Sequence, residues 1–173
     1  MAAALPCAAM ADGLPDTFGA PVSLSLDLTG SVPSRCGFLK APDSSASLGD
    51  LENAGSVALG FTMDCNAPFD IKLRSGNGAL SHVGQQPAPN PFLASLDYTV
   101  GLSVATDLAP VGDACAASAL GSQACSFGDG LSSHDGVSIG TDGSLTLSWT
   151  PPAQKMLAGS YQDQITITVE VRA

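Results

Sequence analysis

Residues 161–173 read YQDQITITVEVRA, and this stretch alternates apolar and polar side chains. The apolar positions are Ile165, Ile167, Val169 and Val171, each separated from the next by one polar residue. Strict alternation predicts a β-strand with one buried face. Because no sequence follows this strand to pair with its free side, we expect an open edge that another chain can use.

A second alternating run supplies a candidate for that partner. Residues 22–28, which follow a Pro- and Gly-containing leader at 13–21, place Val22, Leu24, Leu26 and Leu28 on one face of a predicted strand. Ser23, Ser25 and Asp27 keep the other face polar. A spare strand near one end and an open edge at the other indicate head-to-tail assembly. The alternative is that residues 22–28 fold back and complete their own domain.

The composition limits the class of protein. A length of 173 residues predicts one domain, and a hydrophobic content of 45% excludes a disordered chain. Sixteen acidic residues against 6 basic ones give a net charge of −10, which repels phosphate groups and disfavours nucleic acid and anionic membranes as partners. We expect a leader at 1–11, an extension with the spare strand at 12–30, and a β-domain at 31–173.

Residues 1–11, MAAALPCAAMA, are similar to the end of a secretory signal. They are small and apolar, and Ala9-Met10-Ala11 matches the small-x-small pattern before a cleavage site. The stretch is shorter than the run of about 20 apolar residues that spans a bilayer. The alternative is a retained alanine-rich tail.

The cysteines support export. Loss of the leader removes Cys7 and leaves Cys36, Cys65, Cys115 and Cys125, an even number. Of three possible connectivities we favour Cys36 with Cys65, closing a loop worth about 3–4 kcal/mol in the chain-entropy model, and Cys115 with Cys125. Other pairings, or four reduced thiols in a cytosolic protein, remain the alternatives. The spacing does not indicate a zinc site.

Strands are predicted along most of the remaining chain. Alternation marks residues 57–65 and 69–73, which we interpret as a hairpin, then one long strand over 96–104 and another over 145–149. Residues 107–136 are rich in Gly, Ser, Ala and Asp and are expected to form an extended loop. No convincing helix is found. Short strands, turns and two disulfides predict an all-β sandwich.

The motifs that carry chemistry elsewhere lack their context here. The Gly-rich pieces at 76–78 and 128–130 have no lysine and no helix to make a phosphate loop. His134-Asp135 has no accompanying nucleophile motif, so a solvated loop is preferred to a hydrolytic dyad.

Metal and sugar sites are disfavoured in the same way. The acids Asp129, Asp135 and Asp142 do not have the spacing of a calcium loop. Trp149 lies in phase with the apolar residues of its strand, which favours the core over a sugar-stacking platform. We expect no catalytic residue, no metal, no cofactor and no small-molecule substrate.

Taken together, these residues resemble the spore coat protein U family, which includes the pilin subunits of archaic chaperone-usher pili. The most specific element is the pattern G-x-Y-x-D-x-I-x-I-x-V at 159–169, and Cys36, Cys65, Pro68-Phe69 and Leu96-Asp97-Tyr98 add to it. The similarity covers roughly residues 20–173. The chain departs from the family at 48–51, where an aromatic–Gly pair is usual, and in its second cysteine pair.

The resemblance implies an incomplete immunoglobulin-like β-sandwich that is completed by donor-strand exchange. In such pilins a periplasmic chaperone lends the missing strand, and an outer-membrane usher replaces it with the N-terminal strand of the next subunit. For this chain, the donor strand is residues 22–28 and the acceptor groove is lined by the apolar residues of 165–171. The expected function is a shaft subunit of an extracellular adhesive pilus, a homopolymer without enzymatic activity.

Two other functions stay open at this point. A minor or tip subunit of the same pilus would adhere through exposed apolar loops, but a donor-like strand favours the shaft because a tip has nothing ahead of it to complete. A secreted carbohydrate-binding sandwich would need exposed aromatic residues. The chain has one Trp, two Tyr and six Phe, mostly in phase with predicted core strands.

Overall fold

Alternating apolar residues build the strands of the domain. The computed structural model describes residues 23–84 and 90–172. Its elements in chain order are β1 (Cys36–Lys40), β2 (Gly55–Cys65), β3 (Phe69–Ser75), β4 (Leu80–His82), β5 (Ser95–Leu96), β6 (Thr99–Val104), β7 (Val111–Ala116), the 3-10 turn η1 (Ala117–Ala119), α1 (Ser126–Asp129), β8 (Leu131–Ser132), β9 (Ser138–Trp149), β10 (Tyr161–Gln162) and β11 (Ile165–Val171).

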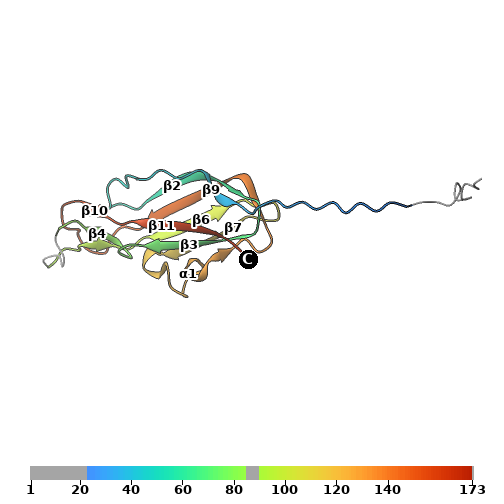
Figure 1. Cartoon of the computed structure of the whole chain (residues 1–173). Helices are drawn as coiled ribbons and strands as arrows, with labels where there is room; N and C mark the ends of the chain where they lie inside the picture. The colour runs from blue at the N-terminus through green and yellow to red at the C-terminus, as the bar shows by residue number, and fades with distance from the viewer. Residues whose placement is uncertain (1–22, 85–89, 173) are drawn as a thin grey trace, which may run out of the picture. The chain divides into compact units, whose positions relative to one another are not determined.

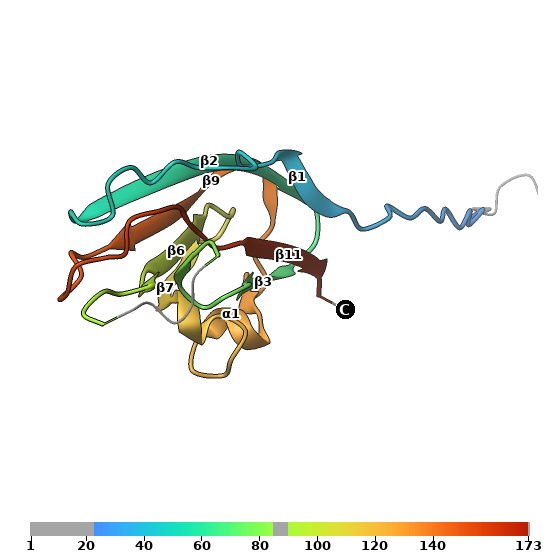
Figure 2. The same cartoon turned by 90° about the vertical axis from the view of Figure 1, so that its left-hand side faces the viewer.

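The strands form two main antiparallel sheets that enclose one core (Figure 1, Figure 2). The larger sheet has the order β1-β2-β9-β6-β7, the smaller has the order β11-β3-β8, and β10-β4-β5 form a third, short sheet. The longest ladder joins β2 to β9 from Gly55–Trp149 to Cys65–Ser138. The protein is therefore an all-β sandwich of the immunoglobulin-like kind, as the sequence predicted.

The core is made by the inward faces of both sheets. Its fully enclosed side chains are Met63, Cys65, Phe69, Ile71, Leu73, Val100, Val104 and Phe127. The prediction that Trp149 packs in the core is confirmed: it is buried, and its indole Nε1 donates a 2.8 Å hydrogen bond to the carbonyl oxygen of Asn53. That bond satisfies the one polar atom of the ring.

Two expectations about strands are wrong. β2 and β3 form no hairpin, because β2 pairs with β1 and β9 whereas β3 pairs with β11 and β8. Residues 66–68 instead carry the chain from one sheet to the other. The single strand expected over 96–104 is divided between β5, in the short sheet, and β6, in the large sheet. The alternation hides the break because Leu96, Tyr98 and Val100 are buried before, within and after it.

The extended loop expected over 107–136 is also wrong, because this region contains β7, η1, α1 and β8. β7 pairs with β6 along its whole length, but its Gly and Ala residues give no apolar alternation to detect. Gly112 lies so close to β6 that a Cβ there would stand 2.6 Å from the carbonyl oxygen of Leu102. Small residues are required where the strands approach, and they conceal the strand from a pattern search.

Two disulfides link the pairs that the sequence favoured. Cys36 and Cys65 face each other as a cross-strand pair of β1 and β2 and are bonded. Cys115 of β7 is bonded to Cys125, which precedes α1, with their Cα atoms 6.0 Å apart. The second bond attaches the helical region to the edge of the large sheet.

The chain divides into two units, Met1–Val32 and Pro33–Ala173. Residues 23–32 of the first unit form no strand or helix, and Leu24, Leu26 and Leu28 are 93%, 77% and 86% exposed. The strand expected at 22–28 is therefore not formed over its described residues, which have no partner strand for a ladder of hydrogen bonds. Val22 and the expected leader at 1–11 lie outside the described residues. No helix in the described residues has the length and apolar composition to cross a membrane.

Candidate functional site

The last strand, β11, uses only one of its two edges. Along one edge it pairs antiparallel with β3 over its full length, from Ile165–Ser75 to Val171–Phe69. No strand of the described residues pairs with the other edge, since β11 is the first strand of the order β11-β3-β8. A row of backbone amides and carbonyls on this edge is therefore available to another strand.

The apolar face of β11 is incompletely covered. In β3 the inward residues Phe69, Ile71 and Leu73 are 0%, 1% and 0% exposed. Their neighbours across the ladder are only half-buried at Ile167 and Val169, and Val171 is 37% exposed. On the inward face of the small sheet, the side chains of β3 are thus fully buried, whereas those of the adjacent strand β11 are only partly buried. The exposure of the inward face therefore increases toward the edge of the sheet formed by β11.

A groove lies next to this face, between the two sheets. It encloses a volume of about 1040 Å³. Ile165 and Ile167 of β11 form one wall, and Leu59 of β2 with Leu147 of β9 form part of the other. All four side chains are half-buried apolar residues packed against the core. The groove therefore exposes apolar side chains of the core, and polar residues from 43–52 and 160–164 also line it.

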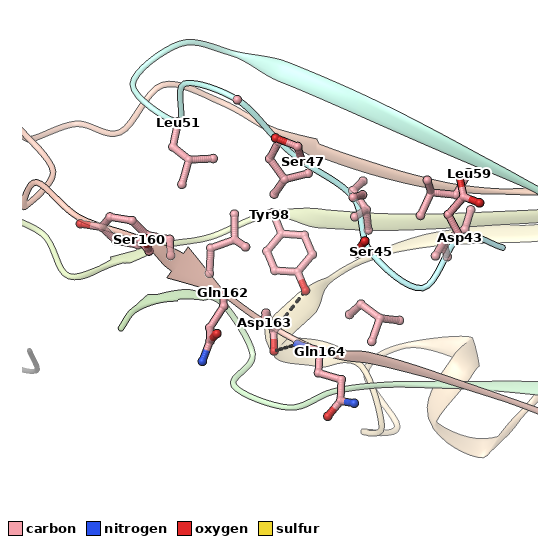
Figure 3. Close-up of a pocket in the computed structure, with 18 of the residues that line it drawn as sticks. Asp43, Ser45, Ser47, Leu51, Leu59, Tyr98, Ser160, Gln162, Asp163 and Gln164 are labelled. Atoms are coloured by element: carbon pink, nitrogen blue, oxygen red, sulfur yellow. Dashed lines mark hydrogen bonds between the residues drawn. The ribbon is translucent and has the colours of Figure 1, made fainter. Parts of the chain in front are cut away.

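A segment without regular structure, residues 41–50, runs along the groove and covers part of it (Figure 3). Leu48 from this segment and Leu51 just after it are half-buried and packed against the core. Residues 42–49 make no hydrogen bond with any other described residue. The cover is therefore held by two apolar side chains and by its flanking strands, not by a ladder.

The end of the groove where β11 begins is fixed by Asp163. Its carboxylate accepts hydrogen bonds from the hydroxyls of Tyr98, at 2.6 Å, and Ser75. It also accepts hydrogen bonds from the backbone N–H groups of Asn77, at 2.9 Å, and Gln164, at 2.7 Å. Figure 3 shows the Tyr98 ring pointing across the groove to this carboxylate. Four donors from three segments of the chain converge on one residue.

This arrangement shifts the pKa values of both partners. Burial raises the pKa of Asp163, but the hydrogen bonds from Ser75, Tyr98, Asn77 and Gln164 outweigh burial and leave that pKa below its ordinary value. Burial, together with the bond to the Asp163 carboxylate, raises the pKa of Tyr98. At neutral pH the carboxylate is thus charged and the phenol is neutral, and the bond between them is strong.

The same region explains the G-x-Y-x-D pattern at 159–163. The Tyr161 hydroxyl has its one proton within hydrogen-bond distance of two carbonyl oxygens, those of Leu157 at 2.7 Å and Leu93 at 3.1 Å, and its ring meets the His82 ring edge to face with the centroids 5.2 Å apart. Gly159 has φ +151, and a Cβ there would lie 2.2 Å from Nε2 of His82. The motif is therefore structural: it sets the path of the chain into β11.

The structure brings together part of the predicted acceptor set. Ile165 and Ile167 line the groove, whereas Val169 and Val171 continue the same face of β11 without lining it. Reasoning from sequence missed the opposite wall and the cover. Leu48 and Leu51 carried a usable signal, since they are the apolar residues of an otherwise small and polar segment. Nothing in the sequence marks Leu59 and Leu147 as less buried than their strand neighbours.

The other candidate residues are not assembled into a site in the described part of the chain. His134 and Asp135 are both exposed, and no hydrogen bond joins their side chains. The acids at 129, 135 and 142 form no cluster there. The group with metal-ligand spacing in the described ranges is Asp113 with Cys115 and Cys125, whose sulfur atoms are bonded to each other. A disulfide sulfur is not the thiolate that binds a metal.

Comparisons with known proteins give a distant likeness. No protein-family model matches the chain, and no curated protein matches it. Among solved structures, a chain described as a chaperone-tip adhesin complex of CFA/I fimbriae biogenesis aligns with a TM-score of 0.45 and 16% identity. The alignment covers 81% of this chain, which spans 43% of the length of that one.

Proposed function

We propose that this chain is a structural, non-enzymatic subunit of an extracellular pilus that polymerises by donor-strand exchange. One observation carries the proposal: β11 has an edge that no described strand pairs with, beside a groove that exposes apolar side chains of both sheets, and the same chain carries an exposed segment with the matching alternation. In the assembled fibre, residues 22–28 of one subunit would lie in the groove of the next and pair with β11.

The two segments match in length and pattern. β11 spans seven residues, from Ile165 to Val171, with four of them on the inward face. Residues 22–28 are equally long and also present four apolar side chains on one face. At about 3.3 Å per residue, either segment extends for roughly 20 Å. One segment can therefore pair with the other along its whole length.

The gain from insertion is large enough for a durable joint. Burying Val22 and the three leucines contributes about 1.5–3 kcal/mol each, before the cost of ordering the segment is subtracted. The new ladder along β11 contributes about 0.5–1.5 kcal/mol per hydrogen bond. Leu24, Leu26 and Leu28 are exposed to solvent in the described single chain, so their full transfer into the groove counts as gain.

The geometry of the joint supports a fibre. The donated segment and the groove are different surfaces. Each subunit would insert its segment into one neighbour and receive the segment of another, so the contact does not close into a dimer. Before assembly, an open edge over apolar side chains is prone to aggregation. A periplasmic chaperone that covers the groove, and an outer-membrane usher that exchanges chaperone for donor, would meet this need. Two disulfides suit an oxidising compartment.

A shaft role accounts for the chain better than a tip role. A subunit at the tip needs a groove but has no subunit ahead of it that requires a donor strand. This chain has both the groove and an exposed segment with four apolar positions in phase. We therefore assign it to the repeating part of the fibre.

The test is assembly itself. Purified full-length chain should form filaments visible by electron microscopy, and deletion of residues 12–30 should abolish them. Deletion of residues 1–11 is the matched control and should leave assembly intact. Adding a copy of residues 20–30 after Ala173 should fill the groove in cis and give a stable monomer. A chain that lacks residues 12–30 yet is already stable and monomeric would contradict the proposal.

A further inference from the structure

The sandwich has a second side at which its two sheets meet. The large sheet ends in β1 and β7, and the small sheet ends in β11 and β8. β1 lies next to β11 beside the groove, whereas β7 lies next to β8. β8 pairs only with Asp70 and Ile71 of β3, so no strand of the described chain pairs with that edge of β3 from Lys72 to Ser75. By strand pairing alone, both sides of the sandwich would be open.

Residues 117–130 close this second side, and we call them the plug. They contain η1 and α1, and in Figure 2 the part labelled α1 lies beside β3, away from β1. Phe127 is fully buried and Leu120 is buried with it, both as members of the hydrophobic core. A Cβ at Gly121 would lie 3.4 Å from Cγ of Arg74. The plug therefore reaches the part of β3 that β8 leaves uncovered.

Two bonds tie the plug to β7. One is the disulfide between Cys115 and Cys125. The other is a hydrogen bond of 2.5 Å from the hydroxyl of Ser126 to Oδ2 of Asp113, whose Oδ1 accepts a 2.8 Å hydrogen bond from the backbone N–H of Ala114. The bond from Ser126 lowers the pKa of Asp113 below its ordinary value, so the carboxylate is charged at neutral pH. A charge on an edge strand such as β7 disfavours pairing with another chain.

The groove side is closed less firmly. Its cover, residues 41–50, contributes the half-buried Leu48 to the core, and residues 42–49 make no hydrogen bond with any other described residue. The plug, in contrast, contributes a fully buried aromatic ring and is bonded covalently to β7. It also continues directly into β7 at one end and β8 at the other. Its effective concentration at this side therefore exceeds that of a separate chain.

We propose that the plug is an autoinhibitory segment that keeps the second side of the sandwich from accepting a strand, so that each subunit has one acceptor groove. The count of one groove rests on the function proposed above. A subunit that received strands on both sides would be a branch point, because two neighbours would then be attached to it. The plug thus restricts assembly to an unbranched fibre.

The number of strands that one subunit binds tests the plug. The probe is a synthetic peptide of residues 20–30, added in excess while the full chain refolds. The chain carries Leu26→Asp, so that its own segment does not compete for the groove. Native mass spectrometry should find one peptide per subunit. Opening the plug with Cys115→Ser, Cys125→Ser and Phe127→Ser should raise this number to two.

A matched control and a second measurement make the result specific. Cys36→Ser with Cys65→Ser removes the other disulfide, which closes a longer loop, and should leave one peptide per subunit. Hydrogen exchange locates the peptides: backbone amides of β11 should be protected in every variant that binds peptide, and those on the outer edge of β7 only in the chain with the opened plug.

A cut made after folding avoids the risk that the opened chain does not fold. Gln123 and Ala124 are both exposed, so a protease site inserted between them can be cleaved in the folded protein. Cleavage followed by reduction with a dithiol frees the plug from β7 and should also raise the count from one to two. The uncut chain treated with the same dithiol is the control and should keep one peptide.

Two results would overturn the proposal. If the freed plug leaves the count at one and the amides of β7 unprotected, residues 117–130 are ordinary core packing and the strand-exchange function stands. If the intact chain already binds two peptides with β7 protected, the plug does not close its side. Absence of peptide from the intact chain would contradict strand exchange itself, whereas protection of β7 on opening would still support the plug.

Discussion

The hydroxyl of Tyr98 lies 2.6 Å from Oδ2 of Asp163 and donates a hydrogen bond to it. Tyr98 stands immediately before β6 of the large sheet, and Asp163 stands shortly before β11 of the small sheet. The bond therefore joins the two layers at the end of the groove where β11 begins. The wall formed by Ile165 and Ile167 is held in place by a charged, partly buried residue rather than by apolar packing alone.

Asp163 should make the unfolding free energy of the domain depend on pH. Its pKa is lower in the folded protein than in the unfolded chain, so its contribution is fully present above the ordinary carboxyl pKa of about 3.9 and is lost as the pH falls through the folded value. Asp163→Asn should cost about 1.5–3 kcal/mol of unfolding free energy at pH 7. Denaturant unfolding can be measured on the monomer that carries a copy of residues 20–30 after Ala173. The difference in unfolding free energy between the native and Asp163→Asn proteins should shrink as the pH falls below about 4.

Tyr98→Phe is the companion to that change. Removing the phenol hydroxyl takes away one of the hydrogen bonds that lower the pKa of Asp163, so that pKa should rise toward its ordinary value. An NMR titration of the Asp163 carboxyl measures it. An unchanged pKa would show that Ser75 and the two amides suffice without Tyr98.

Leu26→Asp should abolish filament growth. Leu26 is the third of four apolar residues in the donated segment, so an acid there would enter the groove as an unpaired charge or as a protonated acid, at a cost of several kcal/mol. The domain itself should still fold when a native copy of residues 20–30 follows Ala173. Electron microscopy and circular dichroism report the two effects.

Ser25→Asp is the control for phase. Ser25 stands one residue away and faces outward in the predicted strand, so this variant should polymerise nearly normally. Equal losses from Ser25→Asp and Leu26→Asp would mean that residues 22–28 do not insert as a strand with one buried face.

Gly159→Ala should destabilise the start of the groove wall. The added Cβ meets the His82 ring at 2.2 Å, and the φ of +151 disfavours any side chain, so we expect a loss of about 1–3 kcal/mol. Gly60→Ala in β2 is the matched control, because nothing lies within 4 Å of a Cβ there. Melting temperatures that are lowered equally by both substitutions would contradict a specific role for Gly159.

Non-reducing peptide mapping should recover the links Cys36–Cys65 and Cys115–Cys125 from secreted material, and Cys7 should be absent from it. The first pair closes the longer loop, with a sequence separation of 29. Replacing Cys36 and Cys65 with Ser should therefore cost about 3–4 kcal/mol, against somewhat less for Cys115 and Cys125, whose separation is 10. Crossed links in the peptide map would reject the pairing.

The sequence predicts those parts of the fold in which burial alternates along one strand. β2, β9 and β11 are visible because Phe61, Leu145 and Ile167 stand on faces that turn toward the core at every second residue. β7 cannot be predicted from the sequence, because its close approach to β6 requires Gly112 and the strand has no alternating apolar residues. The hairpin expected between β2 and β3 is wrong because residues 66–68 carry the chain from one sheet to the other, and local composition does not distinguish such a passage from a tight turn.

The candidate site divides in the same way. Ile165 and Ile167 are found from one strand alone, since apolar alternation is a local property of the sequence. The opposite wall at Leu59 and Leu147 depends on how far the second sheet is displaced, which only the three-dimensional arrangement determines. The Tyr98–Asp163 bond joins residues 65 positions apart, and neither residue by itself indicates the other.

The position of the Cys36–Cys65 bond has a mechanical consequence for a fibre. Cys36 is the first residue of β1 and follows residues 33–35, which form hydrogen bonds with Asp64 and Asn66, so tension on the fibre would reach the domain at this point. The disulfide passes that force covalently to the end of β2, which is joined to β9 over its full length. Pulling would load a long antiparallel ladder rather than peel away the short strand β1. Under strain the subunit should hold until its central sheet shears, and a reducing environment should make the same fibre extend at lower force.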